Sequence, residues 1–569
     1  MKTTGFGLVV ALVLLLALPA TSLAISGSAE DITKETIVGP GSVDVQTGKD
    51  ILMSFGATVR MIPTMESDWD FGMSRQVPGY FLVFPPAPNA GYQAGNGFLK
   101  YHANEGGWFN DNYIRNEDKL YFNALPKDRK WSFYAALEFD SGLETQSVDV
   151  RGGKDSEHSS FGLERLHCTY ELPKNMRFHA GWDVWHVDAV EGAGMVYGDD
   201  NPGFWLTGDY MDEALGFNVG YFKIMENDFQ SGPNQAPADP SDRDRDLLAG
   251  YLTMHFDKSA DSTNKFQLFY TYDRIRNVGL GDFPGKVVDP AFGIAGAATG
   301  TVPETDSHHL GFYYLMNYFD FEFFFEYAYQ FGVADEVNLA HNEYDISAHA
   351  FAGDVSYDFR EFAGFSFKPH VGFVYTSGDD DPTDDELNGY NGNVNAQRFS
   401  QRWGGENTII GDTNLVLGTM LYGYVPELYG NGTPVFTGGL QNTAELGGGR
   451  GDNPGMTMIS AGVRMAPKKY LMYNMNVNFF WWNENFNVIN HVSPIDPATG
   501  QLDVTEVGDG HVGTEWDNEV TLALSPNTFV KGQFSWFFSG EGITDVTEAL
   551  GGRADDTAQR LAMEFIWNF

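Results

Sequence analysis

Apolar and polar residues alternate along most of this chain, and residues 559–569 show the pattern most clearly. The apolar positions of this segment are Leu561, Met563, Phe565, Trp567 and Phe569. The positions between them are Arg560, Ala562, Glu564 and Asn568, with Ile566 as the one apolar exception. Because side chains of an extended chain alternate between two faces, the segment is predicted to be a strand with one apolar face and one polar face.

The same alternation recurs along the whole sequence and predicts about 18 strands. Most have the length that crosses a membrane at a tilt, roughly 9–11 residues. They cover residues 51–61, 114–122, 131–139, 163–170, 176–184, 204–210, 215–224, 247–256, 266–275, 310–316, 321–331, 347–357, 365–375, 457–465, 471–481, 516–524, 529–538 and 559–569.

The connections between these segments are sorted by length. About eight short turns alternate strictly with about nine long connections, the longest being 376–456. A soluble β-sandwich also alternates apolar and polar residues, but it has no reason to sort its loops. We therefore predict an all-β fold: a transmembrane antiparallel up-and-down β-barrel with short periplasmic turns and long extracellular loops. Both chain ends are then periplasmic.

The start of the chain predicts export. Met1-Lys2 precedes an apolar run at Val9–Leu18, and small residues lead up to Ala24, as in a secretory signal peptide. No later run reaches the roughly 20 apolar residues of a membrane helix. The predicted division is a signal peptide at 1–24, a periplasmic N-terminal segment at 25–49, and an outer-membrane barrel at 50–569 that contains the long loop 376–456.

Composition narrows the partners. The chain has 569 residues and a formal net charge of −42, which argues against nucleic acid. Cys168 is the only cysteine, so no internal disulfide can form; it is predicted to be a small apolar residue on a strand. No Cys-x-x-Cys-His motif is present, and no cofactor is predicted.

Two stretches resemble the alginate export family of outer-membrane channels. One is 375–382 (YTSGDDDP), where a predicted strand runs into an acidic loop. The other begins at 512–517 (VGTEWD), passes through 532–540 (GQFSWFFSG), and reaches Ala554-Asp555-Asp556 before the last strand. The resemblance implies an outer-membrane channel of about 18 strands. It also implies an arginine-rich pore, as in the members that conduct alginate.

The predicted inward rows carry charges of both signs, which leaves alginate itself open as the solute. The predicted pore-lining residues are Arg60, Arg115, Lys119, Glu138, Arg165, Arg177, Asp183, Asp209, Asp273, Glu322, Glu326, Lys368, Arg464, Glu515, Asp517, Glu519, Lys531, Arg560 and Glu564. Opposed charges in a wet channel produce a transverse field that selects polar solutes. Alternatively, they pair across the lumen and brace the wall, and both hypotheses can hold together.

Other candidate sites are weaker. Asp379, Asp381 and Asp384 are the metal candidates, for a hard cation such as calcium, but their spacing is not that of an EF-hand and a solvated acidic loop is favoured. His308 and His309 are adjacent, so on a strand they point to opposite faces. No catalytic triad or carboxylate pair can be placed from the sequence.

The predicted function is passive passage of hydrophilic solutes, with saccharides as candidates, through a mixed-charge lumen that favours cations. The alternatives are a general trimeric porin without carbohydrate preference, or a barrel whose loops act as an enzyme or adhesin. The predicted partners are outer-membrane lipid, the barrel-assembly machinery through Phe569, and the solute. Whether loop 376–456 folds into the lumen or caps it from outside is left open; its length favours a role.

Overall fold

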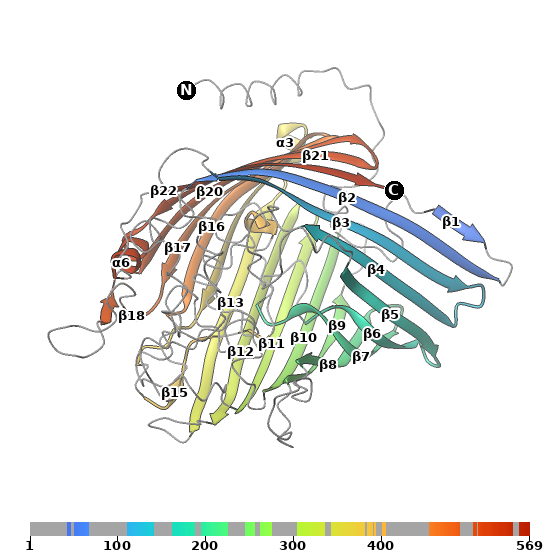
Figure 1. The fold of residues 1–569 in the computed structure, drawn as a ribbon, viewed down its shortest axis with the longest axis horizontal. Helices are drawn as coiled ribbons and strands as arrows, with labels where there is room; N and C mark the ends of the chain where they lie inside the picture. Colours follow the sequence, from blue (N-terminus) through green and yellow to red (C-terminus); the bar gives the residue numbers. More distant parts are fainter. Residues whose placement is uncertain are drawn as a thin grey trace, which may run out of the picture.

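The computed structural model describes residues 43–46, 50–67, 111–141, 162–187, 195–225, 245–256, 262–275, 304–335, 343–381, 384–390, 392–393, 401–405, 454–489, 504–508, 510–549 and 557–569. These residues are almost all in β-strands, and the main sheet closes on itself as an antiparallel barrel (Figure 1). The predicted signal peptide 1–24 lies outside the described residues.

Eighteen strands form the wall, as predicted. They are β2 (Ile51–Ser67), β3 (Asp111–Pro126), β4 (Trp131–Ser141), β5 (Gly162–Leu172), β6 (Met176–His186), β7 (Gly198–Tyr210), β8 (Leu215–Met225), β9 (Arg245–Phe256), β10 (Ser262–Ile275), β11 (Glu304–Tyr318), β12 (Phe321–Asp335), β13 (Glu343–Tyr357), β14 (Ser366–Thr376), β16 (Met456–Lys468), β17 (Leu471–Trp482), β20 (His511–Ser525), β21 (Thr528–Ser539) and β22 (Thr557–Asn568).

The barrel closes where the first wall strand meets the last. β2 pairs with β22 from Thr58↔Asn568 to Ser67↔Gln559, and Ala57 exchanges two backbone hydrogen bonds with Phe569, at 2.7 and 2.9 Å. Beyond Phe569 the short strand β1 (Val43–Gln46) continues along the same edge of β2. Figure 1 shows this seam as the contact between the blue and red ends of the chain. Closure gives the backbone groups at this edge a partner.

Several strands are longer than the sequence pattern predicts. β11, β12 and β13 each have 15 residues. The sequence pattern predicted shorter strands at 310–316, 321–331 and 347–357. The predicted ends fell at polar residues or glycines, such as His309 and Gly332. Strand pairing is made by backbone groups, so the ladder runs on through these positions.

The connections alternate in length as predicted. One end of the barrel carries the short turns and the other carries the long connections; we call these the turn end and the loop end. The turn end includes α3 (Arg360–Ala363), between β13 and β14. At the loop end lie β15 (Glu386–Leu387), the hairpin of β18 (Phe486–Ile489) and β19 (Val504–Val507), and α6 (Glu541–Ala549). The sequence pattern predicted none of these four elements.

The two faces of the wall differ as predicted. On β21 the buried residues include Lys531, Gln533 and Ser535, while Phe538 is exposed on the alternate face. The exposed large apolar side chains, among them Leu252 and Phe373, form the outward rows that suit lipid. No helix within the described ranges is long and apolar enough to span a membrane.

The largest apolar cluster lies inside the barrel. It joins inner-wall residues such as Phe222, Phe269 and Phe324 to residues from four long connections, among them Tyr197 and Trp403. An 18-stranded barrel is too wide for its own side chains to fill. Segments from the connections therefore pack against the inner wall and bury its apolar surface.

Candidate permeation site

Charged side chains on the inner face pair with one another between neighbouring strands. Arg60 of β2 contacts Glu117 of β3 and Glu564 of β22. Lys531 of β21 lies 3.1 Å from the other oxygen of Glu564. These charges therefore pair along the wall, between neighbouring strands, and not across the lumen as one of the two hypotheses for the inward charges had it.

Two further groups show the same arrangement. Lys119 lies between Glu138, at 3.2 Å, and Glu164, at 2.6 Å. Arg245 donates to both carboxylate oxygens of Asp273, at 3.0 and 2.6 Å, and both side chains are almost fully buried. A bidentate pair of this kind fixes orientation as well as charge, so these segments of the wall are rigid.

The long connection between β14 and β16 enters the barrel at two places. The first, the loop-end anchor, consists of Tyr390 and Asn393. The Asn393 Oδ1 atom accepts a hydrogen bond from Thr271 Oγ1 at 2.8 Å, and its Nδ2 atom lies 3.3 Å from Asp273 Oδ2. The Tyr390 ring packs edge-on against His309, at 5.7 Å between centroids. These contacts tie the connection to the inner face of β10 and β11.

The second place, the turn-end anchor, consists of Arg402 and Trp403 of η7 (Gln401–Trp403). Arg402 forms an ion pair with Glu322, the second residue of β12 after its turn. Its guanidinium also lies 4.9 Å from the Phe324 ring centroid and 3.8 Å from Asp354. A connection that starts at the loop end thus reaches nearly to the turn end, inside the lumen.

Trp403 is held in a seat that the wall provides. Its indole Nε1–H donates to Asp354 Oδ2 at 3.2 Å, and its carbonyl oxygen accepts from Asn478 Nδ2 at 2.8 Å. A Cβ atom at Gly372 of β14 would lie 2.2 Å from the indole nitrogen. Gly372 is therefore required by the close approach of Trp403.

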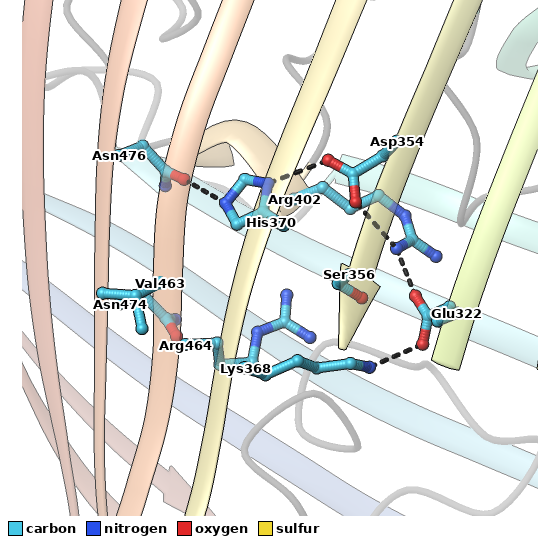
Figure 2. A pocket seen from close by; sticks show the side chains of 10 residues that line it. All are labelled: Glu322, Asp354, Ser356, Lys368, His370, Arg402, Val463, Arg464, Asn474 and Asn476. Atoms are coloured by element: carbon cyan, nitrogen blue, oxygen red, sulfur yellow. Dashed lines mark hydrogen bonds and ion pairs between the residues drawn. The ribbon is translucent and has the colours of Figure 1, made fainter. Parts of the chain in front are cut away.

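The turn-end anchor forms one side of a recess in the inner wall (Figure 2). The recess encloses about 350 Å³, including solvent at its opening. Its lining residues are Glu322, Asp354, Ser356, Lys368, His370, Arg402, Val463, Arg464, Asn474 and Asn476. Figure 2 shows Arg402 between the two carboxylates, with Lys368 reaching Glu322 from below at 2.6 Å. The recess thus offers hydrogen-bond donors and acceptors side by side.

A histidine connects the wall to the anchor. His370 Nδ1 lies 2.8 Å from Asp354 Oδ2, and its Nε2 lies 2.7 Å from the Asn476 amide. With that amide turned so that its nitrogen faces the ring, Asn476 also donates to the Arg402 carbonyl at 3.2 Å and accepts from Gly404 N–H at 3.1 Å. This orientation satisfies both groups of the amide and adds two bonds between β17 and the anchor.

The charge of Arg402 is maintained in spite of its burial. Burial disfavours the charged guanidinium, but the nearby Glu322 and Asp354 carboxylates outweigh this effect and hold the pKa of Arg402 above its ordinary value. The anchor therefore remains cationic throughout the physiological pH range.

The predicted pore-lining residues with described side chains lie on the inner rows. Glu322, Lys368 and Arg464 meet in the recess. Arg165 lies 3.9 Å from Asp183, and Glu519 accepts from Gln533 at 3.3 Å.

The remaining predicted pore-lining residues differ in exposure. Buried residues are Glu326, Glu515, Asp517 and Arg560. Arg177 and Asp209 are exposed near the turn end, where Arg177 pairs with Glu171 at 2.8 Å. The side chain of Arg115 lies outside the described residues.

Sequence reasoning missed Arg402, Trp403, His370 and Asn476. The first two lie in a long connection without periodicity, and their place depends on tertiary contacts. The one available signal was glycine inside a strand, because Gly372 and Gly462 mark where other groups approach the backbone. A Cβ at Gly462 would lie 2.4 Å from His370 Nε2 and 2.3 Å from the Asn476 side-chain amide.

The acidic segment of the long connection folds on itself. Asp379 is buried and accepts from the backbone N–H groups of Asp381 and Asn388, each at 3.3 Å, while Asp384 accepts from Glu386 N–H at 2.8 Å. Across the described ranges, no group of three acidic, histidine or cysteine side chains is placed to hold a metal ion. His308 and His309 point to opposite faces, as their adjacency predicted.

Comparison with known proteins agrees with this geometry. Residues 229–426, about a third of the chain, match the family described as alginate export. This region of the chain is similar to that family. The match includes the acidic stretch at 375–382 that suggested the family, whereas the stretch at 512–556 lies outside it. The described strands form a closed antiparallel barrel of 18 strands, the fold of outer-membrane channels.

Several solved structures are similar at low identity. OccK11 (OpdR) of Pseudomonas aeruginosa is 10% identical with a TM-score of 0.40, over 91% of this chain and 96% of that protein. The outer membrane protein opdK of the same organism is 10% identical with a TM-score of 0.43, over 90% and 99%. OmpT of Vibrio cholerae is 10% identical with a TM-score of 0.35, over 92% and 100%. No curated protein sequence matches the chain.

Proposed function

We propose that this outer-membrane channel passes hydrophilic solutes by passive diffusion, and that saccharides are its preferred class. The observation that carries this proposal is the turn-end anchor. Arg402 and Trp403 stand in the lumen at a recess whose donors and acceptors are polar side chains of the wall together with Arg402 itself. A solute moving along the inner wall meets this recess near the turn end.

The chemistry of the recess favours sugars. A sugar hydroxyl both donates and accepts hydrogen bonds, and the recess provides Asn474 and Ser356 next to the carboxylates and cations. Glu322 and Asp354 neutralise the cations beside them, so the recess fits a neutral saccharide better than a polyanion. The family description, alginate export, supports saccharide passage. Lys368 and Arg464 support a polyuronate as the second candidate.

The ion preference follows from the acidic residues of the chain. The inner-wall charges are largely paired, whereas the acidic segment 379–386 lies at the loop-end mouth and the whole chain carries −42. We therefore expect a weak cation preference that grows at low salt, where screening is reduced.

Planar-bilayer recordings test both parts of this proposal. Reversal potentials in a KCl gradient are expected to show cation preference, and neutral oligosaccharides are expected to interrupt the current more than oligouronates do. Anion preference with block by oligouronates alone would favour the polyuronate. Equal currents with and without either sugar would favour a general porin without carbohydrate preference.

The proposed orientation places the loop end outside the cell and the turn end in the periplasm, after cleavage of a signal peptide at 1–24. Single cysteines at residues 384–386, on a Cys168→Ser background, are expected to react with an impermeant thiol reagent on intact cells. Cysteines at residues 128–130, in the turn between β3 and β4, are expected to react only after the outer membrane is broken. The reverse pattern would refute the orientation.

A further inference from the structure

The outward face carries a row of charges at the loop end of β8–β11. Cross-strand register places Lys223, Asp246, Arg274 and Asp306 beside one another on four successive strands. Asp246 lies 2.8 Å from the Lys223 ammonium and 3.5 Å from the Arg274 guanidinium, so it holds both cations. Charges on a lipid-facing surface are costly within the hydrocarbon. The row therefore belongs at the level of the headgroups.

A row of aromatic residues lies directly beneath the charges, two positions closer to the turn end. It contains Tyr221, Tyr272 and His308, and its two tyrosines donate hydrogen bonds to the acids of the charged row. Tyr221 Oη donates to Asp246 at 2.5 Å and Tyr272 Oη donates to Asp306 at 2.7 Å, while the His308 ring stacks on Tyr272 at 4.7 Å. Aromatic residues with polar tips are typical of the membrane interface.

Exposed leucines fix the depth of these rows. Leu248 lies in the aromatic row and Leu310 one row below it, and both side chains are nearly half exposed. Residues two apart on a strand are separated by about 7 Å, so the charges stand about that far outside the aromatic row. Outward residues at the same end of β14, β16 and β17 are uncharged, as at Tyr375, Thr457 and Trp481. The charges are thus a local feature of one side.

We infer that Lys223 and Arg274 bind the phosphate groups of lipopolysaccharide in the outer leaflet, while the tyrosine hydroxyls beneath them hold Asp246 and Asp306 in place. Their side chains are 27% and 34% exposed, so each can contact a further acceptor while Asp246 holds it in place. The Lys223 ammonium and the Arg274 guanidinium flank Asp246 on its two sides, and each is a cation of a kind that binds phosphate. Asp306 lies beside Arg274 in the row, and Asp345 lies further along on the same side. Because these carboxylates repel a phosphate, the phosphate is expected at the Lys223 side.

This inference goes beyond the channel function and rests only on the proposed orientation. Its readout is lipid binding, so it can fail while the channel still conducts. The purified full-length protein in mild detergent is titrated with three probes and observed by native mass spectrometry. The probes are deep-rough lipopolysaccharide, the same lipid after removal of its phosphates, and phosphatidylglycerol.

The wild-type protein is expected to bind the phosphorylated lipopolysaccharide at least roughly tenfold more tightly than either other probe, as expected from one or two charge-assisted hydrogen bonds. K223Q/R274Q is expected to lose this difference. The matched control is K468Q/K469Q, which removes two exposed lysines at the turn end, next to the other leaflet, and is expected to behave like the wild type.

Two results would overturn the inference. One is equal wild-type binding of all three probes, and the other is an unchanged preference in K223Q/R274Q. Heat-modifiable mobility on gels confirms that each variant is folded. If the double variant does not fold, the same titration is made with R274Q alone. The preference of the wild type for the phosphorylated over the dephosphorylated lipid then serves as the second test.

Discussion

Replacing Arg402 by alanine is the sharpest test of the turn-end anchor. The change removes the ion pair with Glu322, the 3.8 Å contact with Asp354 and the guanidinium over the Phe324 ring. It leaves neither acid without a partner, because Lys368 remains 2.6 Å from Glu322 and Trp403 still donates to Asp354.

The expected loss can be sized from these contacts. Removing one member of a buried ion pair typically costs roughly 3–5 kcal/mol. Because both acids keep another partner and Glu322 is partly exposed, we expect the low end, about 3 kcal/mol. A change of this size shifts the ratio of anchored to released connection by roughly 100-fold.

Single-channel recording in planar bilayers reads out this shift. The released connection no longer occupies the lumen beside the recess, so Arg402→Ala is expected to spend more time at a conductance several-fold above that of the wild type. If the variant switches between the same two conductance levels as the wild type but spends a different fraction of time in each, the change lies in the anchor and not in the wall.

Arg464→Gln is the matched control. It removes one cation from the same recess but none of the contacts made by Arg402. This variant is expected to keep the wild-type conductance and to change only the ion preference. If Arg402→Ala and Arg464→Gln both conduct like the wild type, the reasoning about the anchor is refuted.

Three further predictions concern the wall. Deleting Trp567–Phe569 removes the last three partners of β2 at the seam and the end proposed to engage the assembly machinery. Heat-modifiable barrel is therefore expected to disappear from the outer membrane, and normal insertion would contradict this. Gly372→Ala is expected to displace Trp403 and to give the high-conductance level expected of Arg402→Ala. The control is Gly364→Ala, which strains the backbone but adds its methyl group in open space, and it should leave the conductance unchanged. Burial opposes ionisation of Asp358, but hydrogen bonds from Arg360, Ser366 and a backbone N–H outweigh it and lower its pKa. The stabilisation from Asp358 is complete above the ordinary carboxyl pKa and is lost as pH falls through the lowered pKa. Asp358→Asn should therefore reduce the melting temperature in detergent at pH 7, and the reduction should shrink as the pH is lowered below the ordinary carboxyl pKa.

The wall could be predicted from the sequence because its pattern is local. Period-two alternation is set by backbone geometry, so Leu561 and Glu564 are assigned to opposite faces by position alone. The number of strands and the alternation of connection lengths follow from the same pattern. Strand ends were less predictable, because pairing continues through polar residues such as His309 once a neighbouring strand is present.

The site depended on contacts that the sequence does not encode locally. Glu322, Lys368 and Arg464 were identified as inward charges by alternation, but their meeting point is defined by Arg402, which comes from 80 residues beyond Glu322. Nothing in the residues around Trp403 predicts that a connection from the loop end packs near the turn end. The glycine at 372 in an otherwise ordinary strand was the only trace of that packing.

The entry of sugars into proteoliposomes tests the central claim most directly. Liposomes that contain the purified wild-type barrel are diluted into isotonic arabinose, sucrose or raffinose, and swelling is followed by light scattering. We predict that all three sugars enter faster than into liposomes without protein, that the rate falls with sugar size, and that Arg402→Ala raises the rate most for raffinose. Liposomes with correctly inserted barrel that swell no faster than empty ones would contradict the account.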